Sequence, residues 1–104
     1  MSGGNNYPLR GNKATIWEGG TRSAAFVHAP HILGRSNEVS KNLIHVTDWL
    51  PTFLSMAGGD SSVVTPNIDG IDQWLSLKQN TSSPRSEMVY NIDPNPPGLM
   101  DKVL

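Results

Sequence analysis

The sequence predicts an α/β fold with parallel-type strands and a covering helix, rich in loops for its length. Three segments lead to this prediction: a strand over 23–28, a helix over 48–57 and a strand over 87–92. A strand, a helix and a strand in this order are typical of a parallel βαβ unit. Because two strands cannot cover both faces of their own sheet, the sequence indicates one part of a larger α/β sheet.

Composition narrows the range of functions. The chain has 104 residues, 37% of them hydrophobic, with ten glycines and eight prolines, which predicts a marginal core. A formal net charge of −1 without runs of like charge argues against nucleic-acid binding and a cationic membrane-binding face. Cysteine is absent, so the chain offers neither disulfides nor thiolates. No apolar run is long enough to predict a membrane span, and the sequence near Met1 lacks the apolar core of a signal peptide.

The N-terminal segment predicts a loop followed by a turn. Residues 1–12 are rich in glycine, asparagine and proline, as extended loops are. A short apolar run over 14–17 then stops at Glu18-Gly19-Gly20. We expect the paired glycines to form a tight turn with positive backbone angles, where a side chain would clash.

The first predicted strand follows this turn. Residues 23–28 are apolar at successive positions, as in a strand buried on both faces, and Pro30 ends the run. Segment 31–44 is polar and predicts irregular structure.

The helix over 48–57 has the strongest signal in the chain. Asp48 is the expected N-cap, which places Pro51 in the first turn, and Gly58 is the expected C-terminal stop. One face of this helix carries apolar residues at the helical period, namely Leu50, Phe53, Leu54 and Ala57.

The last third of the chain predicts a turn over 69–72, a short helix over 73–78 and the strand over 87–92. We interpret Asp69 and Asp72 as residues of the turn and helix cap rather than as paired catalytic acids.

Two other patterns bear on chemistry. His28, His31 and His45 could suggest a metal site, but Pro30 breaks any shared helical face and no fourth ligand has suitable spacing, so we predict no metal site. Asn80-Thr81-Ser82 is a glycosylation sequon in a polar linker. Such triplets also arise by chance, and this one matters only if the protein enters the secretory pathway.

Lys13 and Arg10 stand out beside the glycines. A lysine near a loop is usually a solvated surface group. Here a glycine-rich segment would let the backbone approach a ligand closely, and an ammonium on a flexible stem is a compact counter-charge for an anion. Glu18 and Arg22 flank the glycine pair and could form an ion pair or simply be exposed.

The motifs in this chain resemble, in register and over about residues 3–95, the arylsulfatase B branch of the sulfatase family. They are GGNNYPLRGNK (3–13), WEGGTR (17–22), FVHAP (26–30), HVTDWLPT (45–52), AGG (57–59), DGID-x-W (69–74), SPR-x-E (83–87) and YNIDP (90–94).

The resemblance implies an enzyme with an alkaline-phosphatase-like α/β sandwich, whose sheet the 48–57 helix would cover. It implies hydrolysis of aryl sulfates or sulfated glycosaminoglycan sugars by a formylglycine, with calcium holding the sulfate, in a lysosomal or secreted glycoprotein. Lys13 takes the place of the lysine of Arg-Gly-x-Lys that contacts the sulfate in this family. The neighbouring residues would support it structurally, with Trp17 as an apolar peg beside Glu18, Gly19, Gly20 and Arg22.

Other family elements are missing from these residues. The nucleophile motif Cys-x-Pro-Ser-Arg, the N-terminal aspartate pair and the Asp-Asn-Gly-Gly element that supply nucleophile and calcium ligands do not occur. We therefore expect residues 1–94 to be a C-terminal portion of a sulfatase catalytic domain and residues 95–104 to be a linker into a smaller C-terminal domain. We expect this chain, a fragment or truncated product, to be inactive alone and to bind no cofactor.

Two other interpretations remain open. The chain could be a non-catalytic module that binds sulfated glycans or pairs with a full-length relative, although its near-neutral charge argues against clustered anion binding. It could also be a small α/β domain of unrelated function, in which case the isolated chain should unfold cooperatively.

Overall fold

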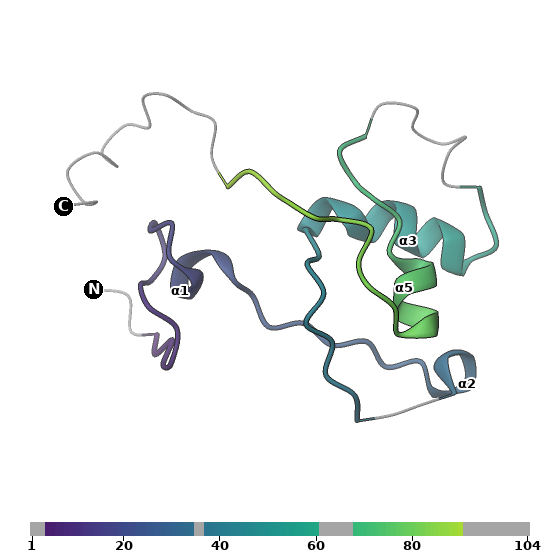
Figure 1. The fold of residues 1–104 in the computed structure, drawn as a ribbon, viewed down its shortest axis with the longest axis horizontal. Coiled ribbons are helices and arrows are strands. Elements are labelled where there is room, and N and C mark those ends of the chain that lie inside the picture. The colour runs from purple at the N-terminus through teal and green to yellow at the C-terminus, as the bar shows by residue number, and fades with distance from the viewer. Residues whose placement is uncertain (1–3, 35–36, 61–67, 91–104) are drawn as a thin grey trace. The chain divides into compact units, whose positions relative to one another are not determined.

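The computed structural model describes residues 4–34, 37–60 and 68–90. The chain divides into two compact units, one formed by residues 1–27 with 89–104 and the other by residues 28–88. Regular structure in the described residues is helical (Figure 1): α1 (Glu18–Thr21), α2 (Pro30–Leu33), the 3-10 helix η1 (Val46–Asp48), α3 (Trp49–Met56) and α5 (Trp74–Gln79).

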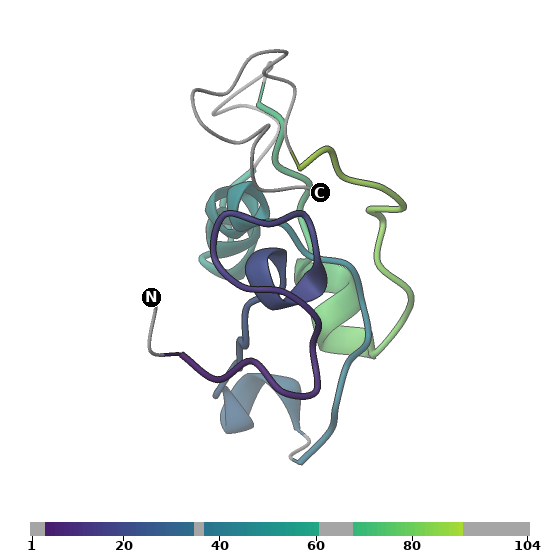
Figure 2. The same ribbon diagram turned by 90° about the vertical axis from the view of Figure 1, so that its left-hand side faces the viewer.

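In the first unit, the chain curls around α1 before entering it, as Figure 2 shows. The backbone N–H of Gly19 donates to the carbonyl of Arg10 at 2.7 Å, so the loop and the helix are joined directly. A Cβ on Gly19 would lie 2.1 Å from the carbonyl oxygen of Gly11. A Cβ on Gly20 would lie 2.4 Å from that of Asn12. Glycine is therefore required at both positions by the close approach of backbone.

The predicted glycine turn with positive angles is wrong. Gly19 and Gly20 lie inside the single helical turn α1, and the left-handed residues of this segment are Gly11 (φ 85°) and Ala14 (φ 73°). The paired glycines do mark a position where a side chain would clash, as predicted. The clash, however, would be with neighbouring carbonyl groups, and it does not arise from a left-handed backbone conformation.

The two predicted strands do not form in the described residues. Segment 23–28 has no regular secondary structure, and neither do residues 87–90, while residues 91–92 lie outside the described part. Phe26 is 90% exposed, which contradicts a strand buried on both faces. A strand is stabilised by backbone hydrogen bonds to a neighbouring strand, and the described residues supply none to these segments. The predicted βαβ unit is therefore absent from this part of the chain.

The helix α2 lies where irregular structure was predicted. Pro30 occupies its first turn, where the missing N–H costs nothing, and Gly34 ends it in the left-handed conformation at φ 63°. Both signals were present in the sequence, but the segment was too short for a hydrophobic period to show.

In the second unit, α3 and α5 pack against each other and α2 contacts α5. The two helices predicted over 48–57 and 73–78 are confirmed, with bounds shifted by a residue. Gly58 ends α3 as expected, in the left-handed conformation at φ 78°. The N–H of Gly59 closes the end by donating to the carbonyl of Leu54 at 2.9 Å.

The buried residues of α3 are not those of the predicted apolar face. Pro51 and Thr52 are buried, whereas Leu50 is 54% exposed and Phe53 is 56% exposed and stacks on Trp49 with ring centroids 5.5 Å apart. Among the described residues no hydrophobic side chain is fully buried. The expectation that the apolar face would cover a sheet is therefore not met within this structure, because no sheet is present in the described residues to receive it.

Candidate functional site

Lys13 lies at the tip of a hydrogen-bonded turn. The N–H of Thr15 donates to the carbonyl of Asn12 at 3.1 Å, which makes Lys13 and Ala14 the two central residues. The positive φ of Ala14 is typical of the third position of a type II turn, which ordinarily favours glycine or asparagine. The Thr15 hydroxyl donates to the same carbonyl at 2.7 Å. Two bonds thus hold the turn that presents Lys13.

The loop before this turn is held by Arg10 and Trp17. The Arg10 guanidinium lies over the indole ring, 3.8 Å from its centroid, a cation–π contact that contributes about 0.5–1 kcal/mol at an exposed site. Trp17 is 45% exposed, and one face of its indole ring is covered by this guanidinium. The Asn6 side-chain amide adds a hydrogen bond to the carbonyl of Gly11 at 3.1 Å.

The Lys13 ammonium makes no hydrogen bond or ion pair with the described residues, and its side chain is exposed. The Glu18 carboxylate pairs instead with Arg22 at 3.3 Å, one helical turn along α1. Their side chains are 59% and 61% exposed. Glu18 and Arg22 are therefore both ion-paired and exposed, and the pair contributes about 0.3–0.5 kcal/mol to stability. Lys13 is left as a positive charge available to an anion from solvent.

A second cluster, the Asp48 network, lies inside the second unit. Its six residues are Asp48, Thr52, Gln73, Ser76, Ser83 and Arg85. The Asp48 side chain is fully buried. Arg85 approaches it with two nitrogens, Nη2 at 2.6 Å from Oδ1 and Nε at 2.9 Å from Oδ2. Two such parallel bonds form the strong bidentate arrangement of an arginine–carboxylate pair.

Backbone groups complete the shell around the Asp48 carboxylate. The N–H of Ile71 donates to Oδ1 and that of His45 donates to Oδ2, each at 2.9 Å. Asp48 occupies the N-cap position of α3, but its side chain makes no bond to that helix and instead closes η1 through His45. Asp48 is therefore the N-cap residue of α3, as predicted, but its side chain makes no capping hydrogen bond to α3, because its oxygens are taken by Arg85 and by the backbone N–H groups of Ile71 and His45.

The remaining members extend the network across α3 and α5. The Thr52 hydroxyl donates to the Asp48 carbonyl at 2.6 Å and accepts from the N–H of Gln73 at 2.9 Å. The Gln73 Oε1 accepts from the Ser76 hydroxyl at 3.1 Å and lies 3.0 Å from the Ser83 hydroxyl oxygen, whose single proton it shares with the Leu43 carbonyl. A buried polar network that is satisfied in this way fixes one arrangement of its segments.

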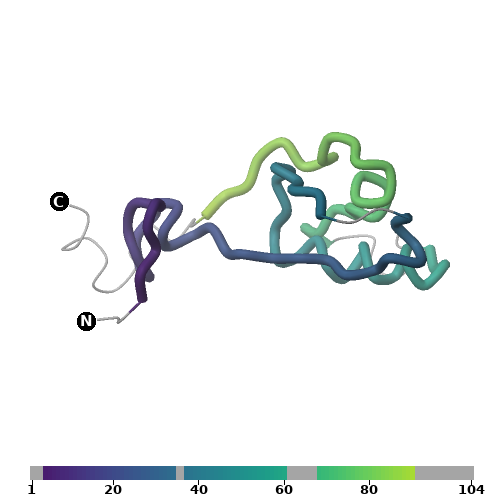
Figure 3. The backbone as a smooth tube through the Cα atoms, turned by 90° about the horizontal axis from the view of Figure 1, so that it is seen from below, coloured from purple at the N-terminus to yellow at the C-terminus, as the bar shows by residue number. Residues whose placement is uncertain are grey.

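The network also sets the course of the chain after α5, which can be followed in Figure 3. Asn42 Nδ2 donates to the carbonyl of Thr81 at 2.8 Å, and the Ser83 hydroxyl donates to that of Leu43 at 2.7 Å. Arg85 then reaches Asp48, so segments 42–48 and 81–85 run side by side in the same direction. These links are made by side chains, and neither segment is a strand.

The ion pair shifts both ionisation equilibria. Burial by itself would raise the pKa of Asp48, but hydrogen bonds from Arg85, Ile71 and His45 outweigh it and lower that pKa from 3.8 to about 2. The hydrogen bond to Asp48 raises the pKa of the Arg85 guanidinium. Asp48 is therefore ionised at neutral pH and acts as a structural anion.

We expect this carboxylate to make the fold acid-sensitive. The pKa of Asp48 is about 2 in the folded chain, against an ordinary value of 3.8. The contribution of this carboxylate to the free energy of unfolding is therefore complete above about pH 4 and is lost as the pH falls through 2. The loss is about 2 kcal/mol. Urea unfolding midpoints measured between pH 6 and pH 2 should show this decrease. The Asp48→Asn variant is the control, because it should start less stable and lack this component of the pH dependence.

Asp69 and Asp72 are structural, as the sequence predicted. Asp72 Oδ1 accepts from the N–H of Trp74 at 2.8 Å at the start of α5, and Oδ2 accepts from the Ser55 hydroxyl of α3. The carbonyl of Asp69 accepts from Arg85 Nη2 at 2.7 Å. Asp72 thus contributes its carboxylate and Asp69 its backbone carbonyl, so these contacts do not join the two carboxylates as a pair.

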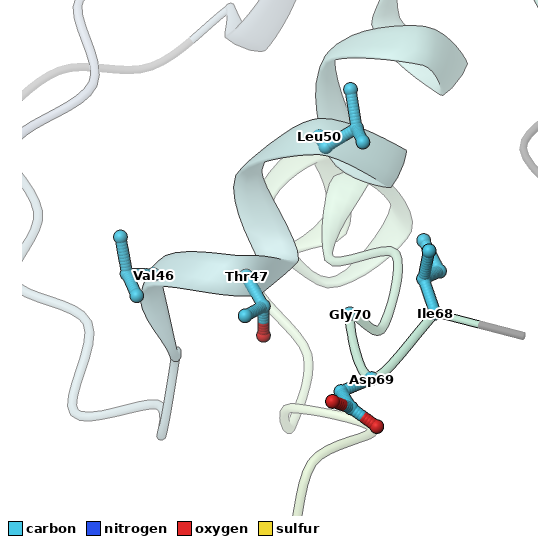
Figure 4. Close-up of a pocket in the computed structure, with 6 residues that line it drawn as sticks. All are labelled: Val46, Thr47, Leu50, Ile68, Asp69 and Gly70. Carbon is cyan, nitrogen blue, oxygen red and sulfur yellow. The ribbon is translucent and has the colours of Figure 1, made fainter. Parts of the chain in front are cut away.

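An open pocket of about 390 Å³ lies beside the start of α3 (Figure 4), lined by Val46, Thr47, Leu50, Ile68, Asp69 and Gly70. Asp69 supplies the charge of this lining, and a carboxylate repels an anion. The pocket is therefore unsuited to a sulfate ester, and Lys13 is the better candidate for anion binding.

The described residues do not fit a calcium site. In this part of the chain no group of three His, Cys, Asp or Glu side chains is arranged to hold a metal ion. His45, one of the three histidines considered above, uses its Nδ1 in a hydrogen bond with the Thr47 hydroxyl at 2.8 Å. None of the helices described is long and apolar enough to cross a membrane.

Comparison with known proteins gives two informative likenesses. The chain is 45% identical over 95 residues, 89% of its length, to Arylsulfatase J of Mus musculus. It is 29% identical over 102 residues, 93% of its length, to a Sulfatase of Formosa agariphila. These alignments span 15% and 17% of the two relatives, so the chain covers less than a fifth of either. No protein-family model and no solved structure matches the chain.

Proposed function

Because this chain belongs to the sulfatase family, we propose that it is part of an arylsulfatase B-like sulfuric ester hydrolase. The family implies an alkaline-phosphatase-like fold for the enzyme. Its substrates would be aryl sulfates or sulfated glycosaminoglycan sugars. The similarity to Arylsulfatase J along 89% of the chain supports the family, and the arylsulfatase B branch stays a prediction from the motifs.

The residue on which this proposal mainly rests is Lys13. It occupies the lysine position of the Arg-Gly-x-Lys motif, and its exposed ammonium has no partner among the described residues. We assign it to the sulfate group, where a fixed positive charge would stabilise the negative charge that builds on the sulfate and bridging oxygens as the ester bond breaks. The Asn12–Thr15 turn and the Arg10–Trp17 stack support this role, because a preset charge needs little reorganisation during the reaction.

The nucleophile and the metal would come from other residues of the parent enzyme. A formylglycine would attack the sulfur and a calcium ion would hold the sulfate oxygens in such an enzyme. These 104 residues contain no cysteine, and the described ones hold no calcium site. We therefore propose that the isolated chain does not turn over sulfate esters, because one lysine alone lowers the barrier little.

The exposed apolar side of α3 supports the view that the second unit belongs to a larger domain. Leu50 and Phe53 are both more than half exposed, and contiguous apolar surface of this kind ordinarily packs against other structure. We propose that residues 1–94 form part of the catalytic domain and that residues 95–104, which lie outside the described residues, lead into a smaller domain. We also propose that the parent enzyme is lysosomal or secreted.

The direct test uses the native protein, captured with an antibody raised against segment 48–57. We expect it to hydrolyse an aryl sulfate and its peptide map to contain an upstream peptide with cysteine converted to formylglycine. The isolated 104-residue chain, assayed in parallel, should be inactive. A native product without an upstream peptide and without turnover would contradict the enzymatic proposal and favour the glycan-binding interpretation. Salt-dependent retention on a sulfated-glycan column would then test that interpretation.

A further inference from the structure

The end of α5 presents an asparagine whose side chain the fold does not use. Asn80 is the C-cap of α5, in the left-handed conformation with φ 55° and ψ 43°. Its backbone N–H donates to the carbonyl of Ser76, which closes the helix. The Asn80 side chain is exposed, and its carboxamide makes no hydrogen bond with the described residues. The backbone therefore performs the capping, and the carboxamide is left free in solvent.

The two residues that follow are equally accessible. Thr81 and Ser82 are exposed, and their hydroxyl groups have no partner among the described residues. Ser83 differs, because its hydroxyl is used in the Asp48 network. The carbonyl of Thr81 is anchored by Asn42 at 2.8 Å. Segment 80–83 is thus held in place by its backbone and by the Ser83 hydroxyl. The side chains of Asn80, Thr81 and Ser82 make no hydrogen bond that stabilises the described fold.

Helix capping explains part of this sequence but not all of it. Asparagine is the commonest residue after glycine in the left-handed cap, so the fold accounts for Asn80. It does not account for a hydroxyl residue two positions later, at Ser82. Neither Thr81 nor Ser83 is a proline, which in the middle position would exclude acceptor function. No other asparagine in the chain is followed two positions later by serine or threonine.

We propose that Asn80 is an N-glycosylation site, formed by the exposed Asn80-Thr81-Ser82 turn at the C-terminus of α5. The donor is a lipid-linked diphosphate oligosaccharide. Asn80 Nδ2 forms the bond to the anomeric carbon of the first sugar, the bond from that carbon to the diphosphate oxygen breaks, and the lipid diphosphate leaves. The amide nitrogen gives up one proton. No electrons are transferred, and the proposal does not depend on the role of Lys13.

The folded chain can keep such a glycan without rearrangement. The oligosaccharide would extend from a carboxamide that already lies in solvent, and none of the six residues of the Asp48 network is part of the sequon. A bulky, polar glycan is compatible with a surface turn of this kind. We therefore expect the glycosylated chain to keep the helices α3 and α5.

The test expresses the full 104-residue chain behind a cleavable secretion leader in a eukaryotic cell. Mass spectrometry of the peptide that contains Asn80 is performed before and after peptide N-glycosidase treatment in heavy-oxygen water. We expect an oligosaccharide mass that the glycosidase removes, leaving an isotope-labelled aspartate at that position. Because the transfer precedes secretion, both the secreted protein and the protein retained in cell membranes are analysed.

Matched variants separate glycosylation from helix capping. Ser82→Ala removes the sequon while Asn80 keeps its cap, and it should abolish the modification without changing the far-ultraviolet circular dichroism of the chain. Thr81→Ala and Ser82→Thr keep the sequon and should remain modified. An unmodified Asn80 in the wild-type chain from both fractions would overturn the proposal, as would an oligosaccharide that persists at this peptide in Ser82→Ala.

Discussion

Replacing Arg85 with alanine is expected to destabilise the second unit by about 3–5 kcal/mol, because it leaves a buried carboxylate without its counter-charge. The Asp48 side chain is fully buried and receives two close guanidinium bonds from Arg85. A loss of this size is a large fraction of the roughly 5–15 kcal/mol that stabilises a typical domain. The variant chain should therefore unfold at a much lower urea concentration than the wild type.

Urea unfolding at pH 7, followed by far-ultraviolet circular dichroism, measures this loss. Arg85→Lys keeps the positive charge but not the bidentate geometry, and it should also be destabilised. Arg22→Ala is the matched control, since it removes the exposed pair with Glu18 and should cost only about 0.3–0.5 kcal/mol. Equal midpoints for Arg85→Ala and Arg22→Ala would show that the Asp48 network does not hold the fold.

Replacing Lys13 with alanine in the native enzyme is expected to lower kcat for an aryl sulfate by about 100- to 1000-fold, the range found when one preset charge-stabilising group is removed. The reason is that the ammonium would compensate charge that is largest in the transition state. The effect on kcat/KM should be at least as large, because the same ammonium would also contact the sulfate of the bound substrate.

Two further variants serve as controls for the Lys13→Ala experiment. Lys41→Ala removes the same charge from another exposed position, in the second unit, and should leave kcat unchanged. Lys13→Arg keeps the charge on a wider group and should recover part of the activity. If Lys13→Ala and Lys41→Ala both retained wild-type kcat, Lys13 would be an ordinary surface lysine and its assignment to the sulfate would be wrong.

The local elements that the sequence predicted correctly are those with short-range causes. The helix over 48–57 combines an apolar period, a proline in the first turn and a glycine at the end, and α3 has these bounds within a residue. The helix α5 was also predicted to within a residue, whereas the segment predicted as a turn over 69–72 has only a bend at Asp69. The segments predicted as strands failed because strand formation depends on hydrogen-bonding partners elsewhere in the chain, which no local pattern supplies.

The Asp48 network could not have been found from spacing along the sequence. Arg85 lies 37 residues from Asp48, and Gln73 lies between them in sequence, at the N-cap of α5. One signal was nevertheless present, since two of the family motifs, HVTDWLPT and SPR-x-E, supply four of its six residues, and DGID-x-W supplies Ile71, whose backbone N–H binds Asp48. Their convergence in space gives these motifs a physical role in holding the second unit together, separate from the chemistry proposed for Lys13.

By itself, the sequence determined the family of this chain, the positions of α3 and α5, and Lys13 as the candidate for sulfate contact. The family and the assignment of Lys13 come from the resemblance of the motifs to sulfatases, whereas the two helices follow from the helical period and the residues at their ends, which are local properties. Only the tertiary structure decided that Gly19 and Gly20 are required by neighbouring carbonyl groups, and that α3 buries Pro51 and Thr52 rather than its apolar face. The reason is that burial and close approach depend on residues distant in sequence, here Arg10, Gly11 and Arg85.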